Sequence, residues 1–359
     1  MQPLGDASYL GQHEDCSFRD CCPTLYWLLC WIPVALVAVL FSWVYYAYVA
    51  VFCYSIVLEE NTVTAMAFAL VFHLLLFLCL WSFALTTLSA PIAVPFPYQL
   101  SAGEQQALSS CRRNEIAHHR LLDMLALQRG VLTVGADGCV RICEPCCLVK
   151  PDRCHHCSTC RKCIPKMDHH CPWFNNCVHF GNYKFFLLTL FYAVALSVYG
   201  VATIGTHEAR AWLSASATSS SLHLTLVSLL GVVLTFGLGS FLCTHISMLL
   251  SNETTLEDMR GPVFRNPEDS FDVGRYHNFV QVFGPRGSLW MAPVFTSIGD
   301  GVRFPTKLHP VLEVSQTVPV LADARITARD ASPGVVRPAR LPTDSLRSSS
   351  PTTPLSASM

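Results

Sequence analysis

Hydrophobic residues in this chain gather in four long stretches instead of alternating with polar residues. A helix of about 20 apolar residues crosses the hydrocarbon core of a bilayer, and each stretch reaches that length. We therefore predict four membrane-spanning helices, the first a retained anchor because it begins late and is too long for a signal peptide. The stretches cover about residues 26–52, 63–88, 185–204 and 222–250.

Composition supports a membrane protein. Hydrophobic residues make up 52% of the 359 residues and charged residues 14%, which lies outside the usual range of soluble domains. The sequence thus predicts an α-helical integral membrane protein with four transmembrane helices.

The distribution of Lys and Arg predicts the orientation of these helices. Basic residues are frequent between the second and third stretches and after the fourth, whereas the two connections on the other side contain only Arg210. Because Lys and Arg favour the cytoplasmic side, we expect both termini and the central segment in the cytosol. The basic residues of the central segment are Arg112, Arg113, Arg120, Arg129, Arg141, Lys150, Arg153, Arg161, Lys162 and Lys166.

The other segments differ in composition. Residues 101–130 have a leucine spacing compatible with a helix, lying either on the membrane surface or against the rest of the loop. The Ser-, Thr- and Pro-rich end of the chain is typical of disorder. The expected order is a cytosolic N-terminus (1–25), transmembrane helices 1 and 2 (26–88), a cytosolic linker (89–136), a cysteine-rich domain (137–184), transmembrane helices 3 and 4 (185–250), a cytosolic extension (251–310) and a disordered tail (311–359).

Cysteines are concentrated in the central segment. Ten of the 18 fall between Cys139 and Cys177, in a region assigned to the reducing cytosol, where disulfides seldom persist. Two C-x-x-C pairs with further Cys and His residues predict zinc binding, and two ions are favoured over one. Closed zinc sites would also stabilise a segment too poor in aliphatic residues to build its own core.

The segment contains more Cys and His residues than the eight that two tetrahedral zinc sites require, so some are spare. A spare thiol beside a histidine is a candidate nucleophile. The run from Asp168 to Cys171 supplies a carboxylate to orient an imidazole, an imidazole to accept a proton, and a thiol to attack.

The residues around this run resemble a known family. The sequence from Asp168 to Trp173, followed by Asn176–Val178 and Asn182, is similar to the signature of the DHHC protein acyltransferases. The similarity extends upstream to Cys143. It implies one zinc ion on Cys143, Cys146, His156 and Cys163, a second on Cys157, Cys160, His170 and Cys177, and packing roles for Cys147 and Cys154.

The resemblance implies a protein S-acyltransferase, or palmitoyltransferase. His169, oriented by Asp168, would take the thiol proton of Cys171, which would accept a fatty acyl group from acyl-CoA and pass it to cysteines of membrane-associated proteins. His155 would lie near palmitoyl-CoA. Lys150 and Arg153 could face either CoA phosphates or anionic lipid. Aromatic residues could line the mouth of the acyl cavity or anchor at the interface, namely Trp173, Phe174, Phe185 and Phe186.

Weaker matches and two departures complete the likeness. Thr254–Glu257 resembles the family's TTxE element, although a capped helix start would explain it as well, and Asn278–Gly284 resembles a C-terminal motif. Residues 297–301 are similar to a branch found in Golgi and post-Golgi membranes. By contrast, His179 stands where the family has glycine, and Ser89–Pro91 stands where it has a DPG element.

Three other classes of protein compete with the enzyme. The departures motivate a zinc-stabilised membrane scaffold without turnover. A nucleic-acid-binding zinc module is disfavoured by the cluster's position between two spans and by its spacing. A transporter is disfavoured because His73 and His245 are the chief ionisable residues within the spans. Cys21 and Cys22 could carry acyl groups, although ordinary burial is favoured.

Overall fold

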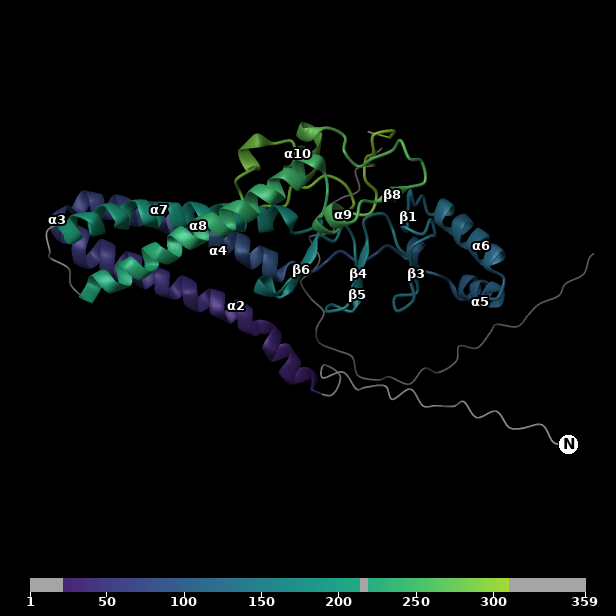
Figure 1. The fold of residues 1–359 in the computed structure, drawn as a ribbon, viewed down its shortest axis with the longest axis horizontal. Coiled ribbons are helices and arrows are strands. Elements are labelled where there is room, and N and C mark those ends of the chain that lie inside the picture. The colour runs from purple at the N-terminus through teal and green to yellow at the C-terminus, as the bar shows by residue number, and fades with distance from the viewer. Residues whose placement is uncertain (1–21, 214–218, 310–359) are drawn as a thin grey trace, which may run out of the picture. The chain divides into compact units, whose positions relative to one another are not determined.

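The computed structural model describes residues 22–213 and 219–309 (Figure 1). The predicted tail and most of the N-terminal segment, including Cys21, lie outside the described residues. Cys22 is exposed, contrary to the burial that we expected.

Among the described residues, four helical segments are long and apolar enough to cross a membrane, which confirms the predicted fold class. The first is longer than predicted, because α2 (Pro23–Tyr45) continues through the π-helix η1 (Tyr46–Val57) into α3 (Leu58–Glu60). The others are α4 (Thr62–Leu88), α7 (Tyr183–Leu213) and α8 (Ser219–Ser251).

Asn61 alone separates the first apolar segment from α4. Its backbone is extended, and its side-chain oxygen accepts a hydrogen bond from the Thr64 N–H at 3.0 Å. This N-cap satisfies a backbone donor that the first turn of α4 cannot pair internally. The chain can therefore reverse between two long helices with one residue.

The helices pack through aromatic and aliphatic side chains. α7 packs along both α4 and α8, and Tyr48 stacks on Phe72 with ring centroids 4.2 Å apart. Large apolar side chains on the outer faces remain exposed, such as Val39 at 67% and Leu70 at 72%. Such surfaces are costly in water and favourable in hydrocarbon, as expected for membrane-spanning helices.

Three short antiparallel hairpins form the cysteine-rich segment. They are β2 (Ile142–Cys143) with β3 (Leu148–Val149), β4 (His155–Cys157) with β5 (Lys162–Ile164), and β6 (His169–Cys171) with β7 (Asn176–Val178). The residue before the second strand has a positive φ in each: 49° at Cys147, 53° at Arg161 and 46° at Asn175. The three hairpins therefore share one turn geometry.

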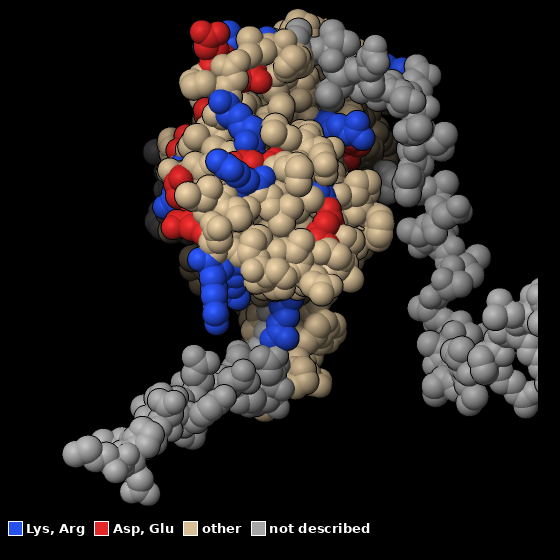
Figure 2. Space-filling view, turned by 90° about the vertical axis from the view of Figure 1, so that its right-hand side faces the viewer, with Lys and Arg blue, Asp and Glu red and all other residues tan. Residues whose placement is uncertain are grey.

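The linker contains two helices where the leucine spacing suggested one. α5 (Ala102–Cys111) starts with a capping box between Ser101 and Glu104, and α6 (Glu115–Gln128) starts at the N-cap Asn114. Their apolar side chains contribute to a core with residues of the cysteine-rich segment and the C-terminal extension. Packing on the rest of the loop is thus the arrangement found. Figure 2 views the end of the molecule with these helices and shows charged side chains of both signs.

The C-terminal extension packs against the segment between α4 and α7. β8 (Val263–Phe264) pairs with β1 (Thr133–Val134), and Phe180 lies in one apolar cluster with Phe271 and Phe304. The remaining elements are the 3-10 helices η2 (Phe96–Tyr98), η3 (Pro172–Phe174) and η4 (Gly287–Leu289) and the helices α9 (Thr255–Met259) and α10 (Arg275–Phe283).

Candidate active site and zinc centres

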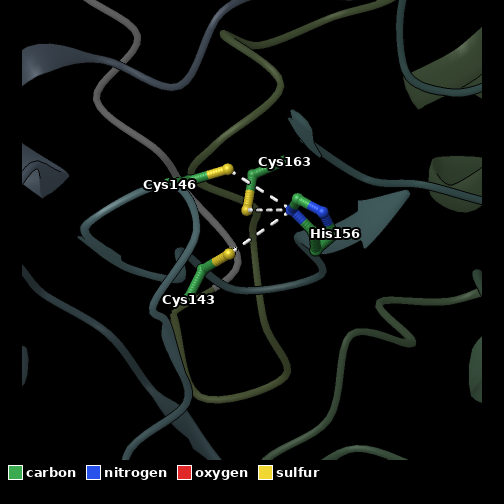
Figure 3. Close-up of side chains that lie close together, drawn as sticks. All are labelled: Cys143, Cys146, His156 and Cys163. Carbon is green, nitrogen blue, oxygen red and sulfur yellow. Dashed lines mark hydrogen bonds between the residues drawn. The ribbon is translucent and has the colours of Figure 1, made fainter. Parts of the chain in front are cut away.

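The first metal-capable cluster joins the first two hairpins (Figure 3). His156 Nδ1 lies 3.4 Å from the sulfur of Cys143, 3.3 Å from that of Cys146 and 4.0 Å from that of Cys163. Ligand atoms at zinc's usual bond lengths in a tetrahedral site are about 3.6 Å apart. Three thiols and an imidazole at this spacing fit one zinc ion.

The second cluster joins the second and third hairpins. His170 Nδ1 lies 3.7 Å from the sulfur of Cys157 and 3.5 Å from those of Cys160 and Cys177. Hydrogen bonds from Cys177 and His170 lower the pKa of Cys160, which favours the thiolate that zinc requires. The structure thus brings together both sets of four that the resemblance implies, and both could bind zinc.

The two clusters are built alike. Each has one C-x-x-C pair at a hairpin turn and one His–Cys pair directly opposite across the next hairpin, His156 with Cys163 and His170 with Cys177. Every ligand of the second set stands 14 residues after its counterpart in the first. The segment is therefore a short tandem repeat, below the 20 to 50 residues of ordinary repeat units.

Cys171 stands outside both clusters, at the end of β6. Asp168 Oδ2 accepts a hydrogen bond from His169 Nδ1 at 2.6 Å, and the Cys171 side chain lies close enough to influence the charge of the His169 ring. Asp168 is 2% exposed and is fixed by Thr255, whose hydroxyl and N–H donate to its two oxygens at 2.7 and 3.0 Å. The carboxylate thus fixes the imidazole beside the thiol.

The hydrogen bonds determine the charge of this group. Burial opposes protonation of His169, yet the hydrogen bond to Asp168 and the nearby Cys171 outweigh it and raise its pKa to about 9. Burial likewise opposes ionisation of Asp168, but the bond from His169 lowers its pKa. A free cysteine thiol ordinarily has a pKa of about 8.5, so an imidazole of pKa about 9 can hold a proton that the thiol gives up.

Aromatic side chains surround the group on the membrane side. Phe186 is 1% exposed and lies edge-on to His169 with ring centroids 5.4 Å apart. Cys171 shares an apolar cluster with Phe174, Phe186 and Leu187. Trp173, by contrast, is 56% exposed. Cys171 therefore lies where apolar helices meet the polar cysteine-rich segment.

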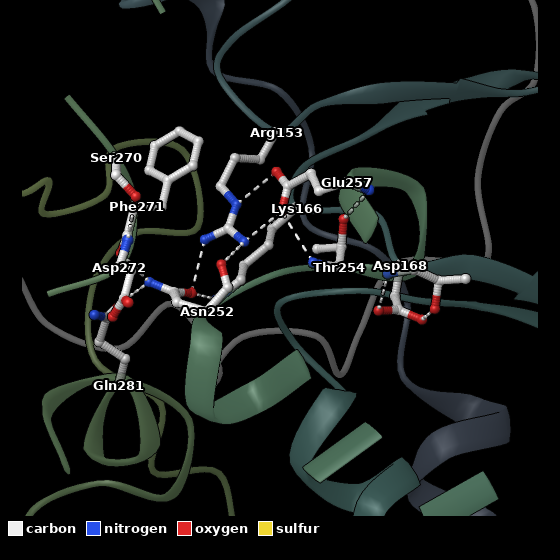
Figure 4. Close-up of polar contacts among 11 residues, drawn as sticks. Arg153, Lys166, Asp168, Asn252, Thr254, Glu257, Ser270, Phe271, Asp272 and Gln281 are labelled. Carbon is white, nitrogen blue, oxygen red and sulfur yellow. Dashed lines mark hydrogen bonds and ion pairs between the residues drawn. The ribbon is translucent and has the colours of Figure 1, made fainter. Parts of the chain in front are cut away.

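Arg153 is directed into the protein (Figure 4). Its guanidinium donates to both carboxylate oxygens of Glu257 at 2.9 and 2.6 Å and to Asn252 Oδ1 and O at 2.9 and 2.7 Å. Burial opposes ionisation of Glu257, but Arg153 lowers its pKa. The predicted contact of Arg153 with CoA phosphates would have to break this buried pair. Thr254 and Glu257 form the capping box of α9, so the TTxE element also starts a helix.

The other predicted acyl-CoA contacts lie in different settings. Lys150 and His155 are partly exposed, and burial together with the charge of Arg141 lowers the pKa of His155 to about 4. Cys154 is buried as a packing residue should be, but Cys147 is exposed, so its predicted packing role is wrong.

Two asparagines for which the sequence predicts no role, Asn176 and Asn182, connect the third hairpin to α4. The Asn176 amide donates to the carbonyls of Thr86, Thr87 and Ser89 at 3.0, 3.3 and 2.8 Å. Asn182 donates to the Thr86 carbonyl at 3.2 Å. These carbonyls end α4 and have no partner within the helix, so the hairpin that contains Cys171 supplies the C-terminal cap of the second span.

His179, the departure from the family pattern, is 1% exposed, and its Nδ1 accepts the Gly181 N–H at 3.0 Å. A Cβ at Gly181 would lie 2.9 Å from the His179 ring. The histidine is thus accommodated in the turn before α7, and it belongs to none of the metal-capable clusters found among the described residues.

Comparison with known proteins gives a consistent result. Residues 139–262 match the family model for DHHC palmitoyltransferases. The chain is 37% identical to palmitoyltransferase ZDHHC20-A of Danio rerio over 85% of this chain and 87% of that relative. It is 39% identical to palmitoyltransferase ZDHHC2 of Homo sapiens over 81% of this chain and 78% of the relative. No observation favours the scaffold without turnover. The chain belongs to the DHHC palmitoyltransferase family and is a protein S-acyltransferase of the membrane.

Proposed function

We propose that Cys171 is the nucleophile that carries the acyl group, with His169 as its base and Asp168 orienting that base. The observation that supports this most is the position of Cys171 outside both zinc-capable clusters and beside an imidazole fixed by a buried carboxylate. Each of the two clusters would hold a structural zinc ion, whose role is to fold the three hairpins.

In the first step, His169 removes the proton of Cys171, and the thiolate attacks the thioester carbonyl of acyl-CoA. The bond to the CoA sulfur breaks, and CoA leaves with the proton that His169 held. In the second step, His169 takes the proton of a substrate thiol, whose thiolate attacks the acyl-enzyme and releases Cys171. One thioester replaces another in each step.

The donor would be palmitoyl-CoA or a similar acyl-CoA, with its chain among the apolar helices and its charged head in the cytosol. Lys150 and His155 are the proposed contacts to the charged head of acyl-CoA. Phe186, which packs against His169, is the proposed contact to the acyl chain. Both termini would be cytosolic, by the excess of basic residues around the cysteine-rich segment. Golgi or post-Golgi membranes are the proposed location.

Acyl labelling of the purified protein tests this proposal. With labelled palmitoyl-CoA we expect hydroxylamine-sensitive label on the wild type and none on Cys171→Ser, with unchanged zinc content. Cys147→Ser is the matched control, because Cys147 is an exposed cysteine of the same segment outside both clusters. Hydroxylamine-sensitive label on Cys171→Ser would show that Cys171 is not the nucleophile. A folded, zinc-bound wild type without label would favour the scaffold.

A further inference from the structure

A third group of metal-ligating side chains lies beside the nucleophile. Ligand atoms of Asp168, His169 and His245 all lie within 4.8 Å of one another, and neither zinc-capable cluster includes these residues. Asp168 and His169 come from the start of the third hairpin, and His245 comes from α8. The reaction uses the first two and leaves His245 without a role.

His245 is held in place by its surroundings. It is 1% exposed, and its Nδ1 lies 3.3 Å from the hydroxyl of Tyr183. Phe186 and Phe241 lie edge-on to its ring at centroid distances of 4.9 and 4.6 Å, and the His169 ring is 6.0 Å away. An imidazole fixed in an apolar wall beside a carboxylate and a second imidazole matches the ligand chemistry of zinc.

We propose that Asp168, His169 and His245 form an inhibitory site for a divalent transition-metal ion, with zinc as the ion of best fit. Zinc bonds to nitrogen and oxygen at about 2.1 Å, which separates two ligands by about 3 Å or more. The hydrogen-bonded pair of Asp168 and His169, now 2.6 Å apart, opens slightly, and the His245 ring moves inward. The His169 side chain is 23% exposed and provides the entry path.

The ion replaces a proton. In the resting site the proton lies between His169 and Asp168, and on metal binding it passes to solvent while the nitrogen and the carboxylate bond the ion. His169 then no longer serves as the base for Cys171, so acyl transfer stops without loss of the two structural zinc ions. This inference rests on the proposed roles of Cys171 and His169.

The test is a titration of the purified full-length protein with zinc at buffered free concentrations. Acyl-enzyme formation and zinc bound per chain are measured together. We expect inhibition to follow binding of one zinc beyond the structural ions. In His245→Gln, which retains a polar group for Tyr183, and in His245→Ala, the inhibitory concentration should rise at least about tenfold, since one ligand is lost.

His73→Gln is the matched control. His73 also lies in a span and also contacts a tyrosine hydroxyl, that of Tyr45 at 3.3 Å, but it belongs to none of the clusters among the described residues. The inhibitory zinc concentration of His73→Gln should equal that of the wild type. Equal inhibition of wild type and both His245 variants would overturn the proposal.

A metal bound directly by Cys171 is the main competitor. Cys171→Ser cannot form the acyl-enzyme but should still bind the additional zinc if the three proposed ligands hold it, and loss of that zinc would overturn the proposal. Zinc binding is measured without acylation. Absence of acyl label in metal-free buffer would therefore reject the proposed function while leaving the binding result intact.

Discussion

The second and third hairpins have strands of the same length and register, but the cysteines that end their first strands differ in metal-binding ability. Cys157 lies opposite Lys162 in one, and Cys171 lies opposite Asn176 in the other, each at the end of its first strand and 14 residues apart. Cys157 belongs to a zinc-capable cluster, whereas Cys171 belongs to none among the described residues.

The difference between the two cysteines comes from the residue three positions later. Cys160 completes the C-x-x-C pair of the second hairpin, whereas Phe174 stands at the matching position of the third and packs against Phe83 at 5.0 Å between ring centroids. The third hairpin is thus a zinc-binding unit without its remaining ligands. The Cys171 thiol therefore stands at a ligand position but outside the clusters of the described residues, beside His169.

The largest effects are expected from substituting Cys171 and Cys157, which should differ in their consequences for zinc content. Cys171→Ser should lower acyl-enzyme formation at least about 1000-fold and leave zinc content and thermal stability unchanged, because it removes only the attacking atom. Cys157→Ser should abolish acylation and also lose one zinc ion and lower the melting temperature, because zinc binding contributes to folding. Zinc loss from Cys171→Ser would contradict the comparison.

Restoring the missing ligand should sharpen the comparison. Phe174→Cys creates a C-x-x-C pair in the third hairpin, so the engineered pair should capture zinc and withdraw the nucleophile. We expect inhibition of acylation at roughly tenfold lower free zinc than in Phe174→Ser, which loses the same packing without adding a thiol. Identical zinc dependence of the two variants would show that the positions are not equivalent.

The connection of the third hairpin to α4 gives the next effect. Asn176→Asp replaces an amide that donates to three carbonyls by a carboxylate that cannot, so Cys171 should lose its position at the end of the span. Small misplacement of a reacting group lowers rates by about 100-fold. We expect acylation to fall by about 10- to 100-fold, together with an altered preference among acyl-CoA chain lengths, while zinc content stays unchanged.

Asn61→Asp is the control at the other end of the same helix. Asn61 accepts a hydrogen bond from the Thr64 N–H, and a carboxylate accepts it equally well. The same substitution should therefore be harmless at the N-terminus of α4 and harmful at its C-terminus. An unchanged chain-length profile in Asn176→Asp would reduce the role of Asn176 to packing.

Local sequence patterns predicted much of this structure. The four spans could be predicted from the length of the apolar stretches, because the bilayer requires that length of any helix. The two sets of metal-ligating residues came from the family resemblance, since spacing left the ligand assignment open. The 14-residue offset between them is present in the sequence but is shorter than the repeats that are usually sought.

Long-range contacts could not be predicted in the same way. Arg153 pairs with Glu257 and Asn252 about 100 positions away, and His245 meets Asp168 only because α8 packs against α7. Local hydrophobic periodicity does not predict contacts between residues so far apart in the sequence. The break between α5 and α6 was missed because the apolar spacing continues across the cap at Asn114.

The smallest effect concerns the pH dependence of stability. Because the folded-state pKa of His169, about 9, lies above the ordinary value of about 6.5, its pair with Asp168 stabilises the fold fully below pH 6.5. This contribution is lost as the pH rises through about 9.

The melting temperature of Asp168→Asn should therefore lie a few degrees below that of the wild type at pH 6.5, with a smaller gap at pH 10. Thr255→Val removes a bond to the same carboxylate without a titrating partner, so its gap should stay constant. A gap for Asp168→Asn that is equally constant would mean that His169 carries no extra proton in the folded state, and the imidazole would then have to act on Cys171 as an ordinary neutral base.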